Sequence, residues 1–334
     1  MMIYLDFLFP PGLRHLELKT GNTPLGDNLF PSGLTCLIFH DQFNNANQPL
    51  GENVLPRGLT QLTLGCPPIS PDFHRHLEHL SCLHFSDCFD QSLCVNAFPP
   101  ALERLTFGVN FNNEIASGVL NSLPHMRHLT FGNQFNNGGK MLDVGVLPTN
   151  LTHLTFGNRF NNGGKMLAVG ALPHKLTHLT FGRRFNNGFE ALKVDVLPDT
   201  LTHLTFGTSF ANGGEALKVN ALPNSIRHLT FGDQFVNGDE DLDVGVLPRN
   251  LTHLTFGQSF DRLIQVNVLP PGLTHLTFGH LFCNGGTELI GKNVLPPSLT
   301  HLALPVFFNE INTEDLFLLH PGLVRVTING ELVK

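Results

Sequence analysis

Histidines recur at the third position of a repeated motif, LTHLTFG, which is clearest at residues 151–157. An imidazole can transfer protons near neutral pH, bind a metal ion, or exchange hydrogen bonds with a partner. The histidines of this His column are His15, His128, His153, His178, His203, His228, His253, His275 and His301. The last eight belong to consecutive copies of the motif, so the element that spaces the copies decides which chemistry they can perform.

Three interpretations of the His column are compatible with the sequence. In the first, the histidines and threonines cover an exposed sheet and form hydrogen bonds sideways to each other. In the second, the column contacts a protein partner, as the concave faces of solenoids usually do. In the third, two adjacent imidazoles share a metal ion, although such a site lacks the third and fourth protein ligands of a zinc site. The third also applies to a second group: His74, His76, His79 and His84.

Specificity is expected where the copies differ, at the two residues after the glycine of the motif. These residues flank the His column along one edge of the predicted sheet, which we call the variable edge. Its basic members can pair with a carboxylate or phosphate of a partner, although a solvated loop without a partner explains them equally well. The candidate partner-binding residues are His128, His153, His178, His203, His228, His253, His275, His301, Arg159, Arg183, Arg184 and Asp233.

Several function classes are not supported by the sequence. It contains no glycine-rich phosphate loop, H-E-x-x-H motif, C-x-x-C pair or nucleophile elbow, and its carboxylates are scattered. The 20 basic and 27 acidic residues give a net charge of −7, which does not indicate a nucleic-acid surface. No apolar run is long enough to cross a bilayer. We therefore predict no enzymatic activity, no metal or other cofactor, and no nucleic-acid or membrane partner.

The element that positions these residues is a sequence repeat. The phenylalanine of the motif occurs at intervals of 25 residues, at Phe131, Phe156, Phe181, Phe206, Phe231 and Phe256. Looser copies, at steps of 21 to 26 residues, have Leu18, Phe39, Leu64, Phe85, Phe107, Phe278, Leu304 and Ile328 at this position. A fixed period of this length is typical of a solenoid, and fourteen copies predict about fourteen coils.

Within one copy, Leu151, Leu154 and Phe156 follow the L-x-x-L-x-L spacing of a leucine-rich repeat. Side chains alternate along a strand, so His153 and Thr155 face solvent on the inner, concave surface while the apolar residues face the core. Neighbouring imidazoles should then lie about 5 Å apart. A charged ring disfavours protonation of the next one, so we expect the column to titrate broadly with a lowered mean pKa.

The rest of the copy predicts an extended, helix-poor convex side. Phe160 and its equivalents should stack as an aromatic spine inside the solenoid. Asn-Gly follows at six copies, where a turn with positive φ is easiest and the Asn amide can bond backbone groups of adjacent coils. The return stretch 166–173 contains glycine and β-branched residues and ends in Leu-Pro, which favours an extended segment over a helix.

The organisation follows from these patterns. Residues 1–12 are predicted to form an N-terminal cap, and residues 13–334 an array of about fourteen coils whose last coil is the C-terminal cap. A helix-start pattern before Pro321 predicts a short helix over 313–320. In the irregular coil we place the strand at residues 80–85 rather than 77–82. The fold class is a right-handed leucine-rich-repeat solenoid of the horseshoe type, mainly β, with a parallel sheet on its concave face.

The cysteines and the N-terminus bear on localisation. Of the six cysteines, Cys36 and Cys82 share a column two repeats apart, roughly 10 Å, which is too far for a disulfide. The opening residues 1–12 lack the basic region of a signal peptide and include Asp6. These features favour a reducing, intracellular location, not a secreted protein.

The leucine-rich spacing, the Leu-Pro-x-x-Leu-Thr closure and the Phe-Asn turn together resemble the FNIP repeat family, a subclass of leucine-rich repeats. Phe43–Leu50 is closest to the family's Phe-Asn-x-Pro pattern, whereas most copies read Phe-Asn-Asn-Gly-Gly. Such proteins are known mainly from amoebae and their large DNA viruses, often behind an F-box, for which no room is seen before Leu13. A viral source would place the chain in the host cytoplasm.

The resemblance implies a non-catalytic scaffold for protein–protein interaction. We expect a protein partner on the concave face and its variable edge. The alternative is a structural or virion-associated repeat protein without a specific soluble partner.

Overall fold

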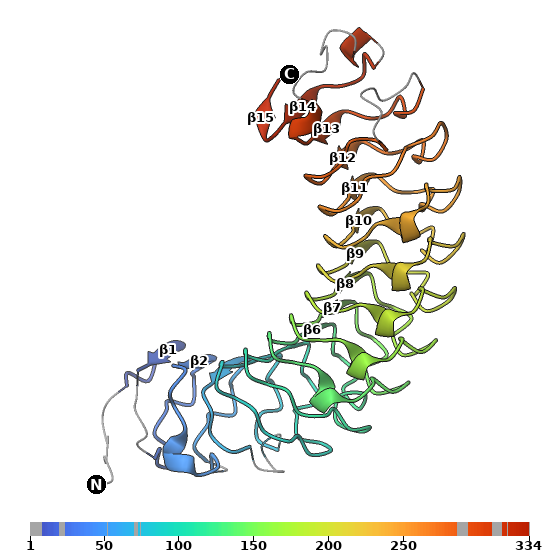
Figure 1. Ribbon diagram of the computed structural model, residues 1–334. Helices are drawn as coiled ribbons and strands as arrows, with labels where there is room; N and C mark the ends of the chain where they lie inside the picture. Colours follow the sequence, from blue (N-terminus) through green and yellow to red (C-terminus); the bar gives the residue numbers. More distant parts are fainter. Residues whose placement is uncertain are drawn as a thin grey trace. The chain divides into compact units, whose positions relative to one another are not determined.

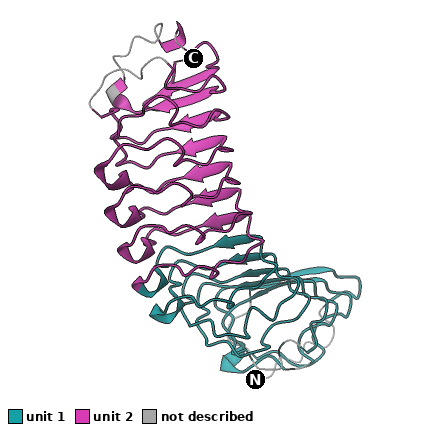
Figure 2. Cartoon of the chain, turned by 90° about the vertical axis from the view of Figure 1, so that its right-hand side faces the viewer, with its two compact units in different colours: residues 1–163 teal, residues 164–334 magenta. Residues whose placement is uncertain are grey.

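The chain folds into stacked coils, each of which contributes one short strand. The computed structural model describes residues 9–19, 24–51, 53–69, 73, 75–285, 293–308, 316–318 and 320–333. The chain forms two compact units, unit 1 (residues 1–163) and unit 2 (residues 164–334), which Figure 2 distinguishes by colour.

Among its described residues, unit 1 contains seven parallel strands that follow one another in sequence order; Figure 1 labels β1, β2, β6 and β7. The strands are β1 (His15–Leu18), β2 (Cys36–Phe39), β3 (Gln61–Leu64), β4 (Cys82–Phe85), β5 (Arg104–Thr106), β6 (His128–Thr130) and β7 (His153–Thr155). Equivalent motif positions pair in register, as His128 pairs with His153. The 3-10 turns of this part of the chain are η1 (Asn45–Asn47), η2 (Asn137–Gly139) and η3 (Asn162–Gly164), which ends at the first residue of unit 2.

Unit 2 continues the pattern with the strands β8 (His178–Thr180), β9 (His203–Thr205), β10 (His228–Thr230), β11 (His253–Thr255), β12 (His275–Thr277), β13 (His301–Leu304) and β14 (Arg325–Ile328). A last strand, β15 (Glu331–Leu332), is antiparallel to β14. The strands lie on one side of the coils and the 3-10 turns on the other (Figure 2). These turns are η4 (Asn187–Phe189), η5 (Asn212–Gly214), η6 (Asn237–Asp239) and η7 (Val306–Phe308).

This architecture confirms the predicted leucine-rich-repeat solenoid with a parallel sheet and a helix-poor outer side. The irregular coil also adopts the predicted register, because β4 begins at Cys82 and pairs that residue with Gln61. Of the helix predicted over 313–320, residues 316–318 are helical, while 313–315 and 319 lie outside the described residues. Most of the predicted cap at 1–12 also lies outside them, so the cap and the array boundaries stay predictions.

The core of most coils contains an aromatic pair, which confirms the predicted spine. Phe206 and Phe210 stack with ring centroids 3.8 Å apart, and each ring stacks on its equivalent in the next coil at 6.1 and 6.2 Å. Both residues are at most 2% exposed. Because the successive copies from Phe107 to Phe282 contribute the same pair, burial of large apolar rings is repeated from coil to coil and stabilises the stack.

The Asn-Gly turns connect adjacent coils, also as predicted. Asn212 has a φ of 53° and is 1% exposed. Its Oδ1 accepts the backbone N–H of Leu192 in the preceding coil at 2.7 Å, and its Nδ2 donates to the carbonyl of Glu215 in its own coil at 2.8 Å. One buried side chain therefore satisfies backbone groups of two coils that water cannot reach. The same Oδ1 contact is made by Asn45, Asn137, Asn162, Asn187, Asn237 and Asn284.

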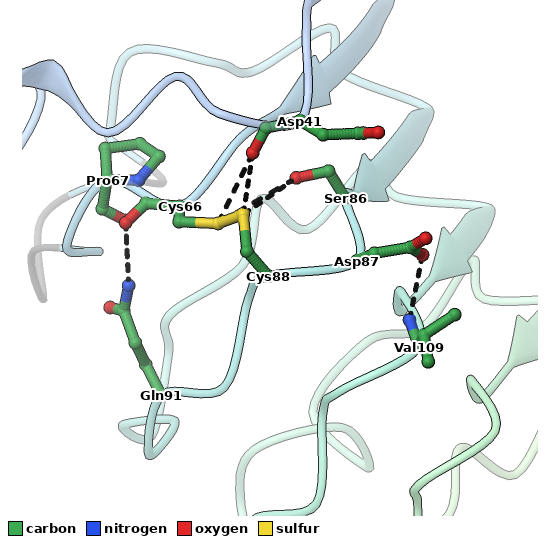
Figure 3. The surroundings of a disulfide bond; sticks show 8 residues. All are labelled: Asp41, Cys66, Pro67, Ser86, Asp87, Cys88, Gln91 and Val109. Carbon is green, nitrogen blue, oxygen red and sulfur yellow. Dashed lines mark hydrogen bonds between the residues drawn. A yellow bond between two sulfur atoms is a disulfide. The ribbon is translucent and has the colours of Figure 1, made fainter. Parts of the chain in front are cut away.

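A disulfide joins Cys66 and Cys88 in unit 1, with Cα atoms 5.8 Å apart (Figure 3). The two cysteines follow neighbouring strands, β3 and β4. Nearby, Gln91 Nε2 donates to the carbonyl of Pro67 at 3.0 Å. The cysteines of the strand column do not reveal this bond, because Cys66 and Cys88 lie in the loops just after the strands.

Candidate functional site

The histidines of unit 2 form one stacked column on the outward side of the strands, which we call the sheet face. Successive ring centroids are 4.1 to 4.2 Å apart, with interplanar angles of 9 to 18°. The rings are half-buried, whereas the leucine after each histidine is buried in the core. The column consists of His178, His203, His228, His253, His275 and His301.

Unit 1 carries a shorter part of the same pattern. His128 and His153 stack with centroids 4.3 Å apart at an angle of 23°. On β1 this position holds His15, whereas on β2 to β5 it holds Cys36, Gln61, Cys82 and Arg104. The structure therefore brings the eight candidate histidines together as two within unit 1 and six within unit 2.

A threonine hydroxyl orients most of these rings. In each case the threonine precedes the histidine, and its Oγ1 lies 2.9 to 3.0 Å from the histidine Nδ1. The pairs are Thr152–His153, Thr177–His178, Thr202–His203, Thr252–His253, Thr274–His275 and Thr300–His301. Sideways bonds between histidines and threonines of the sheet were expected from the sequence, but not the bond from the threonine directly before each histidine. That threonine recurs in six copies, which is the signal that could have revealed it.

The hydrogen-bond pattern assigns the tautomer of a neutral ring that a threonine holds. The hydroxyl of Thr202 also lies 3.1 Å from the carbonyl oxygen of Thr177 in the preceding coil, and a carbonyl can only accept. The single hydroxyl proton is therefore donated to the carbonyl, so Nδ1 of His203 must carry the proton of the Thr202–His203 bond. In the neutral ring Nε2 is then unprotonated and can accept a hydrogen bond.

Three copies have arginine in place of this threonine, at Arg14, Arg127 and Arg227. In unit 2 the consequence is electrostatic. The pKa of His228 is lowered, first by burial and then by the charge of Arg227. The arginine thus gives the middle of the column a fixed positive charge in place of a hydroxyl.

Burial and mutual repulsion lower the pKa values of other rings in unit 2. The pKa of His253 falls to about 4, first because of burial and then because of His228, His275, His203 and His301. Burial, followed by repulsion from other rings of the column, also lowers the pKa values of His178 and His275. These directions agree with the lowered pKa expected from the sequence, and they keep such rings neutral as acceptors well below pH 7.

The arrangement does not favour metal chelation. The rings are nearly parallel and most are held at Nδ1, so the Nε2 lone pairs run side by side rather than converging on one point. Within the described ranges, no group of three or more His, Cys, Asp or Glu side chains is placed to hold a metal ion. Of the second histidine group, His74 lies outside the described residues, and His84 is on β4 with a pKa lowered mainly by burial.

The candidate residues of the variable edge follow the strands. Arg183 and Arg184 are exposed after β8, Arg159 is exposed after β7, and Asp233 is half-buried after β10. The backbone of this edge forms a ladder, in which Ser209 N donates to Arg183 O at 2.8 Å and Ser259 N to Asp233 O at 2.9 Å. Arg159 belongs to unit 1, so only Arg183 and Arg184 of the basic cluster share a unit. Within the described part of the chain, neither of these two forms an ion pair.

No helix among the described residues is long and apolar enough to cross a membrane.

Comparison with known proteins identifies the repeat. The FNIP Repeat family matches residues 21–67, 89–134, 165–209 and 239–280, more than half of the chain. No curated protein matches the sequence. Among solved structures, CroV588, a circular leucine-rich-repeat protein of a giant virus, is 33% identical with a TM-score of 0.67. The match covers 96% of this chain and 57% of that protein, so the chain spans little more than half of its length.

Two further structures share the fold at low identity. The TLR13–ssRNA13 complex is 17% identical over 95% of this chain and 46% of the other, with a TM-score of 0.62. The Drosophila Toll–Spätzle complex is 14% identical over 81% of this chain and 40% of the other, with a TM-score of 0.52. These likenesses concern the leucine-rich-repeat architecture.

Proposed function

Because the chain belongs to the FNIP repeat family of leucine-rich-repeat scaffolds, we propose that it binds a protein partner without catalysis, through the sheet face and the variable edge. The observation that carries this proposal is the ordered column of rings in unit 2. Five of its six histidines are held by a neighbouring threonine hydroxyl, and all six stack in register. Side chains already held in place lose little conformational entropy when a partner binds.

The chemistry of the column supports recognition rather than catalysis. A general base needs a nucleophile or substrate proton within reach and a group that tunes its pKa toward the working pH. The rings instead repeat a similar environment along several strands, and the pKa values of four of them, His178, His228, His253 and His275, are lowered away from neutrality. A row of equal acceptors matches a partner that presents repeated donors, such as the backbone and side chains of an extended segment.

The variable edge supports selectivity. Arg183 and Arg184 are exposed and have no ion pair within the described residues. A guanidinium pairs bidentately with a carboxylate and gives geometric selectivity beyond its charge. We infer that the column supplies a common surface and that the edge discriminates between partners.

The test is affinity capture from a lysate of the source cell, with bound proteins identified by mass spectrometry. A chain with Arg183→Glu and Arg184→Glu is compared with the parent. The matched control carries Lys193→Glu and Lys218→Glu, which reverse two exposed charges in the return stretches after η4 and η5. We expect the control to keep the captured partner and the arginine variant to lose it.

Two outcomes together would overturn the proposal. They are an unchanged set of captured proteins with the arginine variant and an unchanged set with a His203→Gln, His253→Gln variant. Capture of only the chain itself by all variants would favour the structural, self-associating alternative. Light scattering of the purified chain measures that self-association directly.

A further inference from the structure

The repeat pattern breaks twice at neighbouring positions near the end of unit 2. The threonine column on the sheet face runs through Thr255 and Thr277, but its next member is Ala303. The His column ends at the same place, because the residue paired with His301 is Arg325. Both substitutions lie on adjacent strands, β13 and β14.

A hollow of about 240 Å³ lies at this point of the sheet face. Its walls are formed by β12, β13 and β14, and the side chains that matter for its chemistry are His275, Thr277, His301, Ala303, Arg325 and Thr327. Ala303 lacks the hydroxyl and methyl groups that the threonines carry on either side of it. The missing atoms leave space, and the arginine in the next strand stands at the wall of that space.

Arg325 is available to a ligand. Its side chain is exposed, and it has no ion pair within the described residues. A guanidinium has five N–H donors in a planar fork that matches a carboxylate. The strands β8 to β14 and the residue before each of them contain no Asp or Glu. On the other side of β14, Glu331 of β15 pairs with Ile328 and not with Arg325. No carboxylate on β8 to β14 therefore competes for Arg325, although the chain as a whole is acidic.

The second polar wall is an acceptor. Thr300 Oγ1 lies 2.9 Å from Nδ1 of His301 and 3.1 Å from the carbonyl oxygen of Thr274. By the single-proton argument, Nδ1 of His301 carries the proton and Nε2 is bare. The hollow thus combines the cationic donor Arg325 with the Nε2 acceptor of His301. An acidic residue in an extended segment offers the complementary groups, a carboxylate and a backbone N–H.

Size selects the kind of ligand. Small-molecule sites are typically about 300–1,000 Å³ and enclose most of the ligand. A hollow of about 240 Å³ on a sheet face fits one side chain of a larger molecule. We propose that it is a subsite for the carboxylate of one Asp or Glu in an extended segment of a protein partner. This inference rests on the proposed function and adds the partner's chemistry at one point of the surface.

The experiment uses the full chain labelled with ¹³C at alanine methyl groups, so that the Ala303 methyl reports from inside the hollow. The probe is the blocked peptide acetyl-Thr-Val-Glu-Val-Thr-amide. Its matched controls replace Glu with Gln, or move the carboxylate to a free C-terminus behind Gln. We expect the Glu peptide to shift the Ala303 signal saturably in the millimolar range. The Gln peptide should bind about tenfold more weakly, because one charge-assisted hydrogen bond is lost.

Variants of the chain separate the two walls. Arg325→Gln removes the charge and should weaken the Glu peptide about tenfold. Ala303→Thr restores the residue of the column, fills the hollow and should abolish binding, as measured by peptide fluorescence anisotropy because the reporter methyl is lost. Thr255→Ala creates the same gap between His-bearing strands without an arginine and should create no new site. Unchanged melting temperatures show that the variants are folded.

The proposal is overturned if Glu and Gln peptides bind equally, or if Arg325→Gln binds the Glu peptide as the parent does. Stronger binding of the free C-terminus than of the Glu side chain would overturn the assignment to a side chain. If the parent captures a partner while the Glu peptide fails to bind, the subsite is wrong and the proposed function stands. If the peptide binds but no partner is captured, the subsite stands and the proposed function is wrong.

Discussion

Thr252 Oγ1 lies 3.0 Å from Nδ1 of His253 and equally 3.0 Å from the carbonyl oxygen of Arg227 in the preceding coil. One hydroxyl therefore connects an imidazole on β11 to the backbone that enters β10. The orientation of the ring is coupled to the spacing of two coils. Five further threonines bond their histidines in the same way.

Thr252→Val keeps the shape of the side chain and removes the hydroxyl. The Arg227 carbonyl and the His253 Nδ1 then each lose a partner, so we expect a loss of about 1 kcal/mol in the free energy of unfolding. We also expect His253 to change from one Nδ1–H tautomer to a mixture, visible in the ¹⁵N chemical shifts of the ring. Thr255→Val is the control. Thr255 lies two residues after His253 on β11, and its substitution should leave the tautomer of His253 unchanged. A parent His253 with its proton on Nε2 would contradict the assignment.

Stability should fall with pH below neutrality. In the unfolded chain an imidazole titrates near its ordinary pKa of 6.5, whereas the folded pKa of His253 is about 4. Between these values the unfolded chain binds more protons than the folded chain, so acid favours unfolding. The contribution is fully present above about pH 6.5 and is lost as pH falls toward about 4. We expect the melting temperature at low salt to drop by several degrees across this window, and salt to reduce the drop.

A variant with His153→Gln, His203→Gln and His253→Gln tests the source of that drop. Glutamine is compatible with this position because Gln61 occupies the same column on β3. The variant should lose less stability between pH 7 and 4 than the parent. An equal loss, or a parent that melts at one temperature throughout, would show that the column is not a coupled titrating unit.

Gly207 tests the spacing of the coils. A Cβ atom at this position would lie 1.9 Å from the carbonyl oxygen of Gly182 in the neighbouring coil. Gly207→Ala should therefore separate the strands locally and cost about 3 kcal/mol or more. Gly272→Ala is the matched control, because its Cβ would meet only a carbonyl oxygen at 3.9 Å, and its effect should stay within about 0.5 kcal/mol. Thermal melts of both variants make the comparison, and equal melting temperatures would refute the close approach.

The bond between Cys66 and Cys88 predicts a fixed thiol count. Cys36, Cys82, Cys94 and Cys283 are free, so four of the six cysteines should react with a thiol reagent in the unreduced, denatured chain. The bond closes a loop of sequence separation 22, which is worth about 3 kcal/mol in the chain-entropy model. A Cys66→Ser, Cys88→Ser chain should melt lower than the oxidised parent, and a reductant should lower only the parent. Six reactive thiols without reductant would contradict the bond.

The sequence was sufficient for the repeating parts of the fold. A period of 25 residues, alternation around Leu154 and the Phe160 and Asn162 positions all predicted features that the structure confirms, because each residue type meets the same environment in every coil. The same regularity placed the six histidines of unit 2 in one line. Whether those histidines and the arginines of the variable edge bind a partner stays a prediction.

The sequence was insufficient where the relevant contact crosses between coils or departs from the average. The bond from Thr252 to His253 depends on the rotamer of the histidine, which decides whether Nδ1 or Nε2 lies near the threonine hydroxyl. The Cys66–Cys88 bond depends on loop paths that no period describes. The hollow at Ala303 exists only because a small residue and Arg325 occupy neighbouring strands, and their proximity follows from the register of β13 and β14.

The Asn-Gly turns also bear on how this protein ages. An asparagine followed by glycine is the pair most prone to deamidation, because the glycine nitrogen can attack the side-chain carbonyl carbon and close a succinimide. In the folded coils the amide of Asn212 is buried and engaged at both its oxygen and its nitrogen. After conversion to aspartate, an oxygen would face the Glu215 carbonyl where an N–H donor stood before. Each local opening of a coil thus exposes its Asn-Gly pair to irreversible deamidation. We therefore expect the lifetime of the array to depend on how rarely its coils open.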